Sequence, residues 1–244
     1  MTLSGLKFSK FYLLKLKGIE SKDTSLMEEA STGLKYLCRD EHPASLYVLG
    51  KELFLMREKL KDLAGRKAQE QARHYLQISC DKGFPPSFYY LAQMHELGVG
   101  GPVNEEKAME YYQRSKEFGD PQAYFVLSQR ESKAGNEEKA FELLKESAEL
   151  GLLEAQHNLA VKYTELNDDV KAMAWFLQAA KYNFFPSMIN VGMIFLKGNK
   201  EVLANPMAAY IWFNQAQTFQ NSEDLESLIA TAKEQIGKSN KNGA

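Results

Sequence analysis

Side chains suited to metal binding or nucleophilic catalysis are few in this sequence and lie scattered along it. The 244 residues include four histidines and two cysteines: His42, His74, His95, His157, Cys38 and Cys80. None of the histidines pairs with a Cys or another His at the spacing that places two ligands on one helix, and neither HExxH nor CxxC occurs. We therefore expect no metal site and no cofactor.

A hydrolase would need a serine or cysteine nucleophile activated by a nearby base. No Gly-x-Ser-x-Gly elbow distinguishes one serine from the others. Acidic residues such as Glu137 and Asp168 fall where first turns of helices are predicted, and the helix dipole favours negative charge there. The sequence thus predicts no catalytic residue and a protein that is not an enzyme, with hydrolysis as a remote alternative.

A glycine-rich stretch, Leu97 to Val103 with the sequence LGVGGPV, is the closest approach to a ligand-binding motif. Glycine-rich loops that precede a helix can hold phosphate groups. Here no Gly-Lys-Ser/Thr follows the glycines and no strand is predicted before them. We interpret the stretch as a turn between two antiparallel helices.

The sequence is organised by a repeat of 32 to 37 residues, marked by an alanine column. The column consists of Ala72, Ala108, Ala140, Ala172 and Ala209. Four residues before the last four of these stand helix N-capping types, namely Asn104, Asn136, Asp168 and Asn205. Eleven residues after each alanine comes a residue that interrupts the helix, namely Gly83, Gly119, Gly151, Asn183 and Gln220. Each repeat therefore contains a helix with its own start and stop.

A second column precedes the first and pairs a large apolar residue with a small one. It consists of Leu49-Gly50, Leu91-Ala92, Leu127-Ser128, Leu159-Ala160 and Val191-Gly192. The small residues allow the backbones of neighbouring helices to approach closely. Each repeat is predicted to be two antiparallel helices, A and B, which must stack on other copies to bury their apolar faces.

The columns resemble the Sel1-like repeat, a relative of the tetratricopeptide repeat. Repeat 2 carries the resemblance in Leu91-Ala92, His95, Gly98-Val-Gly100, Lys107-Ala108 and Gly119. Repeat 4 carries it in Ala155, Leu159-Ala160, Tyr163, Lys171-Ala172, Trp175-Phe176 and Ala179-Ala180. Repeats 3 and 4 lack the Gly-x-Gly-Val loop. The resemblance implies an all-α, right-handed α/α solenoid of about five helix-turn-helix repeats with helical caps at both ends.

The predicted organisation has five parts. These are a basic N-terminal arm (residues 1–24), a capping helix (25–42), the repeat array (43–220), a C-terminal capping helix (221–237) that ends at Gly237, and a polar tail (238–244). Within the array the repeats span residues 43–84, 85–120, 121–152, 153–184 and 185–220.

Composition limits the compartment and the partners. Residues 1–19 contain four lysines and no acid, which suits either a mitochondrial targeting segment or a helix that packs on the first repeat. The chain has two cysteines, whereas a repeat protein held by disulfides would have many at regular spacing. Reduced thiols and therefore an intracellular location, cytoplasmic or mitochondrial, are expected. The longest uncharged apolar stretch, Phe184 to Leu196, is too short to span a bilayer. A net charge of −2 with dispersed Lys and Arg argues against nucleic acid.

The A helices supply the predicted partner surface. Residues two before and two after the large apolar column share one helix face. They are Tyr89, Gln93, Phe125, Gln129, His157, Val161, Ile189 and Met193. Apolar and aromatic side chains with a few amides suit a partner protein or an amphipathic peptide laid in a concave groove. In the alternative interpretation, several of these side chains pack against neighbouring helices.

The predicted function is that of a non-catalytic adaptor, scaffold or assembly factor that binds a partner in this groove. The resemblance implies settings such as protein quality control, cell-wall synthase activation or assembly of respiratory enzymes. The alternative is a structural subunit of a large complex, with the mitochondrion as one setting. The sequence leaves the partner and the oligomeric state open.

Overall fold

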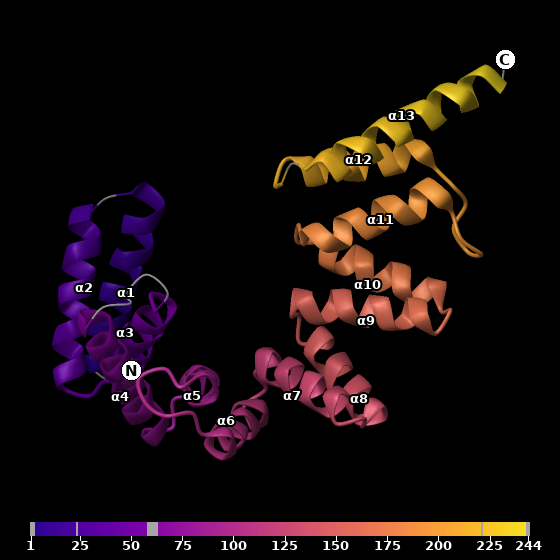
Figure 1. Ribbon diagram of the computed structural model, residues 1–244. Helices are drawn as coiled ribbons and strands as arrows, with labels where there is room; N and C mark the ends of the chain where they lie inside the picture. Colours follow the sequence, from indigo (N-terminus) through magenta and orange to yellow (C-terminus); the bar gives the residue numbers. More distant parts are fainter. Residues whose placement is uncertain (1–2, 23, 58–62, 221, 243–244) are drawn as a thin grey trace. The chain divides into compact units, whose positions relative to one another are not determined.

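The computed structural model describes residues 3–22, 24–57, 63–220 and 222–242 (Figure 1). Over these residues the chain forms thirteen α-helices and no β-strand, which confirms the predicted all-α class. Residues 1–2, 23, 221 and 243–244, which the sequence analysis assigned to the N-terminal arm, the C-terminal cap and the tail, lie outside the described residues. The chain divides into two compact units, Met1–Ala123 and Tyr124–Ala244.

Unit 1 is built from helices that pack on their neighbours in sequence. These are α1 (Leu3–Ser21), α2 (Thr24–Arg39), α3 (Pro43–Leu55), α4 (Leu63–Asp81), α5 (Pro86–Leu97) and α6 (Glu105–Glu117). Helix α1 packs along α2, α3 along α4, and α5 along α6, while α4 also contacts α5. The ring of Phe8 in α1 stacks on His42 at a centroid distance of 5.2 Å. Helix α1 is thereby attached to the start of the first repeat.

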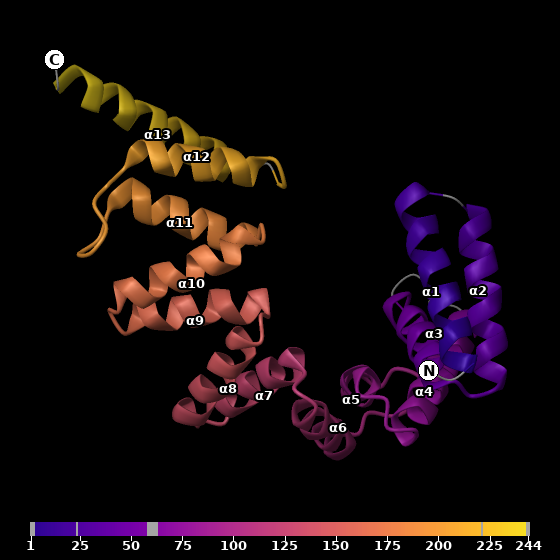
Figure 2. The same ribbon diagram turned by 180° about the vertical axis from the view of Figure 1, so that it is seen from behind.

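Unit 2 continues the same pattern. It contains most of α7 (Pro121–Lys133), then α8 (Glu137–Glu149), α9 (Leu153–Glu165), α10 (Asp169–Lys181), α11 (Phe185–Lys197), α12 (Pro206–Gln217) and α13 (Glu223–Asn242). Seen from the front (Figure 1) and from behind (Figure 2), α9 to α12 follow one another as successive layers of this unit. The largest core cluster joins α9 to α13 and includes Phe176 and Phe213, which are at most 4% exposed.

The two predicted columns form the seams between helices. Every alanine of the first column is at most 5% exposed. A side chain added at Gly192 would collide with the ring of Phe213, and one added at Gly50 would collide with Leu76. The small residues therefore permit a close helix approach that a larger side chain would prevent.

The B helices begin at the predicted capping positions. Asn104 Oδ1 accepts a hydrogen bond from the N–H of Lys107 at 2.9 Å, and Asp168 caps α10 and Asn205 caps α12 in the same way. Asn136 occupies the corresponding position before α8, but the prediction that its side chain caps the helix is wrong. Its side-chain NH2 instead donates to Glu131 Oε2 at 2.8 Å.

The last helix is longer than expected. The sequence analysis ended it at Gly237, but α13 continues to Asn242. A glycine inside a helix costs only about 1 kcal/mol relative to alanine. The ion pair between Lys238 and Glu234, at 2.7 Å and one turn apart, spans Gly237 and supports the extra turn. Within the described residues, no helix combines the length and the apolar character needed to cross a membrane.

Candidate functional site

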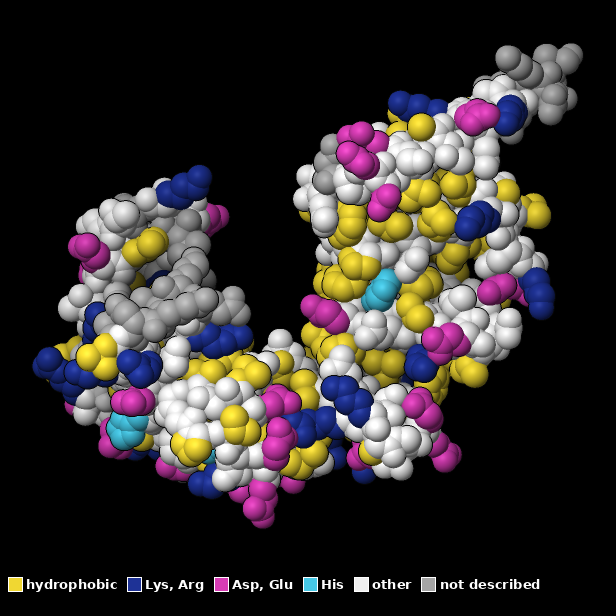
Figure 3. Space-filling view, in the orientation of Figure 1, with side chains coloured by type: hydrophobic (Ala, Val, Ile, Leu, Met, Phe, Trp, Pro, Cys, Tyr) yellow, Lys and Arg dark blue, Asp and Glu magenta, His cyan; other side chains and the backbone are white. Residues whose placement is uncertain are grey.

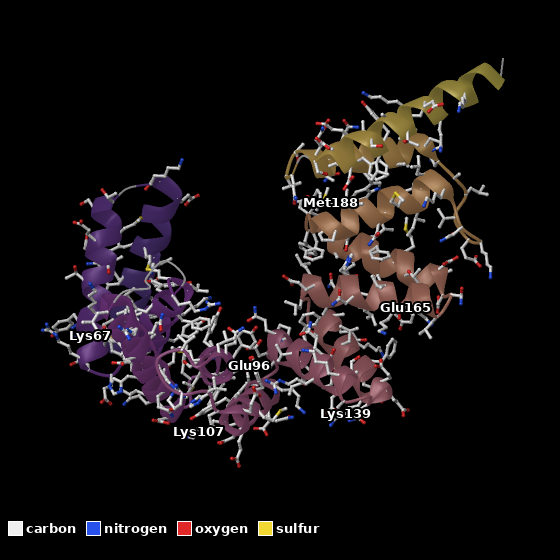
Figure 4. The ribbon with its side chains drawn as sticks, viewed as in Figure 1. Lys67, Glu96, Lys107, Lys139, Glu165 and Met188 are labelled. Atoms are coloured by element: carbon white, nitrogen blue, oxygen red, sulfur yellow. The ribbon has the colours of Figure 1, made fainter. Side chains whose placement is uncertain are left out.

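A groove with a volume of about 1000 Å³ opens in unit 2 where α7, α8 and α9 meet. Its apolar surface comes from Phe125 of α7, Phe141 and Leu144 of α8, and Val161 of α9. The two phenylalanines pack against the buried cluster that contains Leu144 and Leu159, which fixes them in place. The floor of the groove is therefore part of the core of this unit. In Figure 4, the labels of Lys139 and Glu165 mark helices α8 and α9.

The groove brings together three residues that the sequence analysis assigned to the partner surface. Phe125 and Gln129 lie one turn apart on α7, and Val161 faces them from α9. Gln129 is exposed, whereas Phe125 and Val161 are half-buried. Their assignment as binding residues stays a prediction, but the structure gives them a common cavity.

Charged residues of both signs border the groove: Lys133, Lys145, Lys162, Glu137, Glu138, Glu142 and Glu165. Lys162 is neutralised within the chain, because its Nζ lies 3.0 Å from Glu165 Oε2 and 4.0 Å from Glu137 Oε2. Lys145 pairs with Glu149 of its own helix at 3.6 Å. Among the described residues, Glu138 and Glu142 of α8 form no ion pair, which leaves two carboxylates one helical turn apart on the border.

His157, Ile189 and Met193 lie apart from this groove and pack between helices. Nδ1 of His157 is 2.9 Å from Ser187 Oγ of α11, and the imidazole ring rests on Phe176 at 5.4 Å. Burial lowers the pKa of His157, so that the ring is neutral at pH 7. Ile189 and Met193 pack against the core cluster of α9 to α13. These contacts are of the kind expected in the alternative interpretation, in which several of the predicted partner residues pack against neighbouring helices. Figure 3 shows hydrophobic side chains gathered on the visible face over α9 to α12.

Tyr89 and Gln93 lie in unit 1 and contact each other. Gln93 Nε2 donates to the Tyr89 hydroxyl at 3.1 Å, and the Tyr89 ring meets Tyr90 edge-on at 5.4 Å. Both residues are half-buried. They belong to an aromatic surface on α5 rather than to the groove of unit 2.

The same aromatic surface includes two residues that the sequence analysis missed. Tyr47 and Lys51 stand two before and two after Leu49, the first member of the large apolar column, so the spacing rule would have found them. The Lys51 ammonium lies 4.9 Å from the ring centroid of Tyr90, and the Tyr47 ring lies 5.9 Å from it. Burial raises the pKa of the Tyr47 phenol.

The thiols are poor nucleophiles. Burial raises the pKa of Cys38 to about 11 and raises that of Cys80 further. A thiol is reactive as the thiolate, which is scarce at pH 7 at such pKa values. No group of three or more His, Cys, Asp and Glu side chains in the described parts of the chain could hold a metal ion.

A family model described as the Sel1 repeat matches residues 43–84, 87–120, 124–152, 153–181 and 186–216, more than half of the chain. The chain belongs to the Sel1 repeat family. Each match covers one helix pair, from α3–α4 to α11–α12, so the predicted family is confirmed. No curated protein matches the sequence.

Solved structures share this fold. Protein c5321, described as a protective antigen of uropathogenic Escherichia coli with an SLR fold, is 24% identical with a TM-score of 0.66 over 87% of this chain, which spans 45% of that protein. A Sel1 repeat protein from Oxalobacter formigenes is 17% identical with a TM-score of 0.64, and 90% and 96% of the two chains are covered. The immunity protein PA5088 from Pseudomonas aeruginosa is 20% identical with a TM-score of 0.52, and 86% and 74% are covered.

Proposed function

We propose that this Sel1 repeat chain is a non-catalytic adaptor or assembly factor that holds a segment of a partner protein in the groove between α7, α8 and α9. The observation that carries the proposal is the shared cavity of Phe125, Gln129 and Val161, which come from two helices and from the two sequence columns predicted to face a partner. In this proposal the three residues form the centre of the binding site.

The physical character of the groove suits a peptide segment. Its volume of about 1000 Å³ is at the upper end of the range for small-molecule sites, and its apolar floor is anchored in the core. A rigid apolar floor with a charged border resembles the centre of a protein interface, where one or two anchors supply most of the affinity. Tyr89 and Gln93, with Tyr47 and Lys51, are proposed as a separate contact surface of unit 1.

The test uses a bulky substitution that fills the groove without removing a core side chain. Gln129→Trp places an indole in the groove from an exposed position of α7, whereas Gln178→Trp makes the same change at an exposed position of α10 outside the groove. Tagged wild type and both variants are compared by quantitative affinity purification and mass spectrometry. We expect Gln129→Trp to lose its specific partner at least tenfold, which corresponds to about 1.4 kcal/mol, while Gln178→Trp retains it.

The result is interpretable because both variants are expected to fold. Equal helicity by circular dichroism and melting temperatures within a few degrees of wild type establish this. A partner retained equally by Gln129→Trp and Gln178→Trp, with both proteins folded, contradicts the assignment of the groove.

A structural subunit of a large complex is the second candidate, and one observation favours it. The outward positions of α10 and α12 carry Val170, Met207 and Ile211, which are 59%, 51% and 57% exposed. A subunit held permanently by such a surface would elute from native extract only within a large assembly. A transient adaptor would elute mainly as free protein.

A further inference from the structure

In unit 1, the loop of repeat 2 (residues 98–104) lies on helix α4 of the preceding repeat. A side chain added at Gly100 would collide with the backbone of Gln69 and Glu70, so the loop backbone rests directly on the start of α4. Gly100 has a φ of +69°, a conformation that glycine adopts without strain. The loop thus covers the N-terminal half of a B helix.

Two further contacts fasten this loop. The Arg73 guanidinium of α4 donates to the carbonyl oxygen of Pro102 at 3.3 Å. Val99 packs against the buried cluster that contains Leu76 and Leu91. The loop therefore binds α4 with one backbone carbonyl and one β-branched side chain.

The same surface is uncovered in unit 2. Aligning Ala140 of α8 with Ala72 of α4 pairs Glu137, Glu138 and Phe141 with Gln69, Glu70 and Arg73. All three α8 residues line the groove. Only residues 166–168 connect α9 to α10, and this short turn reaches the groove at Leu166 alone. The groove exists because repeat 4 lacks the loop that would fill it.

Repeat 5 again has a longer connection between its two helices. Residues 198–205 connect α11 to α12, and Val202 packs against the core cluster that contains Met173 of α10. Met173 follows Ala172 as Phe141 follows Ala140. Met173 is 8% exposed, whereas Phe141 is only half-buried. Met173 is therefore buried at this position in unit 2, whereas Arg73 under the loop 98–104 is half-buried like Phe141 and contacts the loop by its hydrogen bond to Pro102.

We infer that the groove binds a non-helical, loop-like segment of a partner protein in the position that the loop 98–104 occupies on α4, so that the partner supplies the element missing from repeat 4. This inference rests on the proposed function and adds the conformation and chemistry of the partner. A non-helical segment is preferred to a helix because the corresponding space on α4 is filled by a loop whose backbone turns at Gly98 and Gly100, with φ values of +67° and +69°.

The residues of α8 define the side chains of that segment. Phe141 stands where Arg73 donates to the loop carbonyl, so the hydrogen-bond donor is replaced by an apolar surface that suits a valine, leucine or phenylalanine of the partner. Glu138 and Glu142 lie one turn apart on the border without an ion pair within the described chain, and they suit a lysine or arginine next to the apolar anchor. Because both carboxylates are exposed, their charge orients the segment more than it strengthens binding.

The first experiment fills the groove with a loop of the chain itself. Residues 166–168 are replaced by the loop sequence of residues 98–104, GVGGPVN, which retains a capping residue before α10. A matched control receives GSGGSSN, a loop of equal length without the apolar side chains. We expect the GVGGPVN graft to fold and to lose the partner at least tenfold, and the control graft to retain it.

The second experiment uses a synthetic probe, the peptide LGVGGPVN extended by two lysines, with a version in which both valines are serine as its control. Binding is followed by amide chemical shifts of the isotope-labelled protein. We expect the valine peptide to shift residues of the groove, and the serine peptide and the GVGGPVN-grafted protein to show no such shifts. Glu138→Gln with Glu142→Gln should weaken the probe by roughly threefold at low salt.

The outcomes separate this inference from the proposed function. If Gln129→Trp loses the partner but the GVGGPVN graft retains it, the inference of a loop-like segment is wrong and the adaptor proposal stands. If both folded variants retain the partner, the groove itself is not the binding site. A cross-linked complex in which a helical segment, or a second copy of this chain, occupies the groove also overturns the inference.

Discussion

His95 is a buried histidine held by ring stacking and by a contact with Arg73. It occupies the aromatic position of repeat 2, is 5% exposed, and its ring stacks on Tyr111 at 5.5 Å. One ring nitrogen, Nδ1, faces the guanidinium of Arg73, which also fastens the loop 98–104. Burial, and then the positive charges of Arg73 and Lys107, lower the pKa of His95 to about 4. The neutral ring therefore accepts a hydrogen bond at pH 7.

This pKa predicts a pH dependence of stability. The pKa of His95 is about 4 in the folded chain, whereas that of a histidine in an unfolded chain is about 6.5. Between these two pH values the unfolded chain therefore binds more protons than the folded chain. Stability is therefore full above pH 6.5 and falls as the pH drops toward 4. We expect the melting temperature of His95→Gln, which retains an acceptor for Arg73, to depend less on pH in this window than wild type. His74→Gln, at an exposed histidine, is the control, and a wild-type pH slope in His95→Gln contradicts the prediction.

At the scale of single elements, the helices were predictable and the groove was not. The alanine column and the capping residues Asn104 and Asp168 are local signals, because a cap and its helix lie within a few residues of each other. Phe141 escaped prediction because its exposure depends on a loop absent at residues 166–168, and because the partner residues were predicted on the A helices alone. The missing Gly-x-Gly-Val loop was visible in the sequence. Its consequence, an uncovered surface on α8, could be inferred only from the contact of Gly100 with α4 in the structure.

Helix α1 offers a prediction about the N-terminus. A side chain added at Gly33 of α2 would collide with the ring of Phe11 of α1, so Gly33→Leu should displace α1. Overpacking costs about 1–3 kcal/mol, which corresponds to a roughly 5- to 150-fold larger open population. Limited trypsin digestion with mass spectrometry should show faster cleavage at Lys10 and Lys15. Thr32→Leu, at the neighbouring exposed position, is the control. Unchanged cleavage in Gly33→Leu would mean that α1 does not pack on α2 in solution.

At the scale of the molecule, each unit contains its own core, as expected for a repeat protein whose helix pairs contact only their neighbours. Unit 1 holds the cluster around Leu76 and Phe88, and unit 2 holds the clusters around Leu159 and Phe213. The predicted repeat period accounts for this organisation, because stacking one helix pair on the next buries apolar surface between pairs that are neighbours in the sequence. The identity of a partner is not encoded in that period.

The separate cores predict that residues 119–244, which contain α7 to α13, fold by themselves. The fragment retains every residue that lines the groove, so it should be helical, unfold cooperatively and bind the LGVGGPVN-derived probe with an affinity within about threefold of the full chain. Its melting temperature should be lower, because a shorter array has fewer stabilising neighbours. A fragment of residues 137–244 lacks α7 and with it Phe125 and Gln129, and it should fold without binding the probe. If the longer fragment is unfolded by circular dichroism, or folded without binding, the groove depends on contacts beyond unit 2 and the assignment of the site to α7, α8 and α9 is wrong.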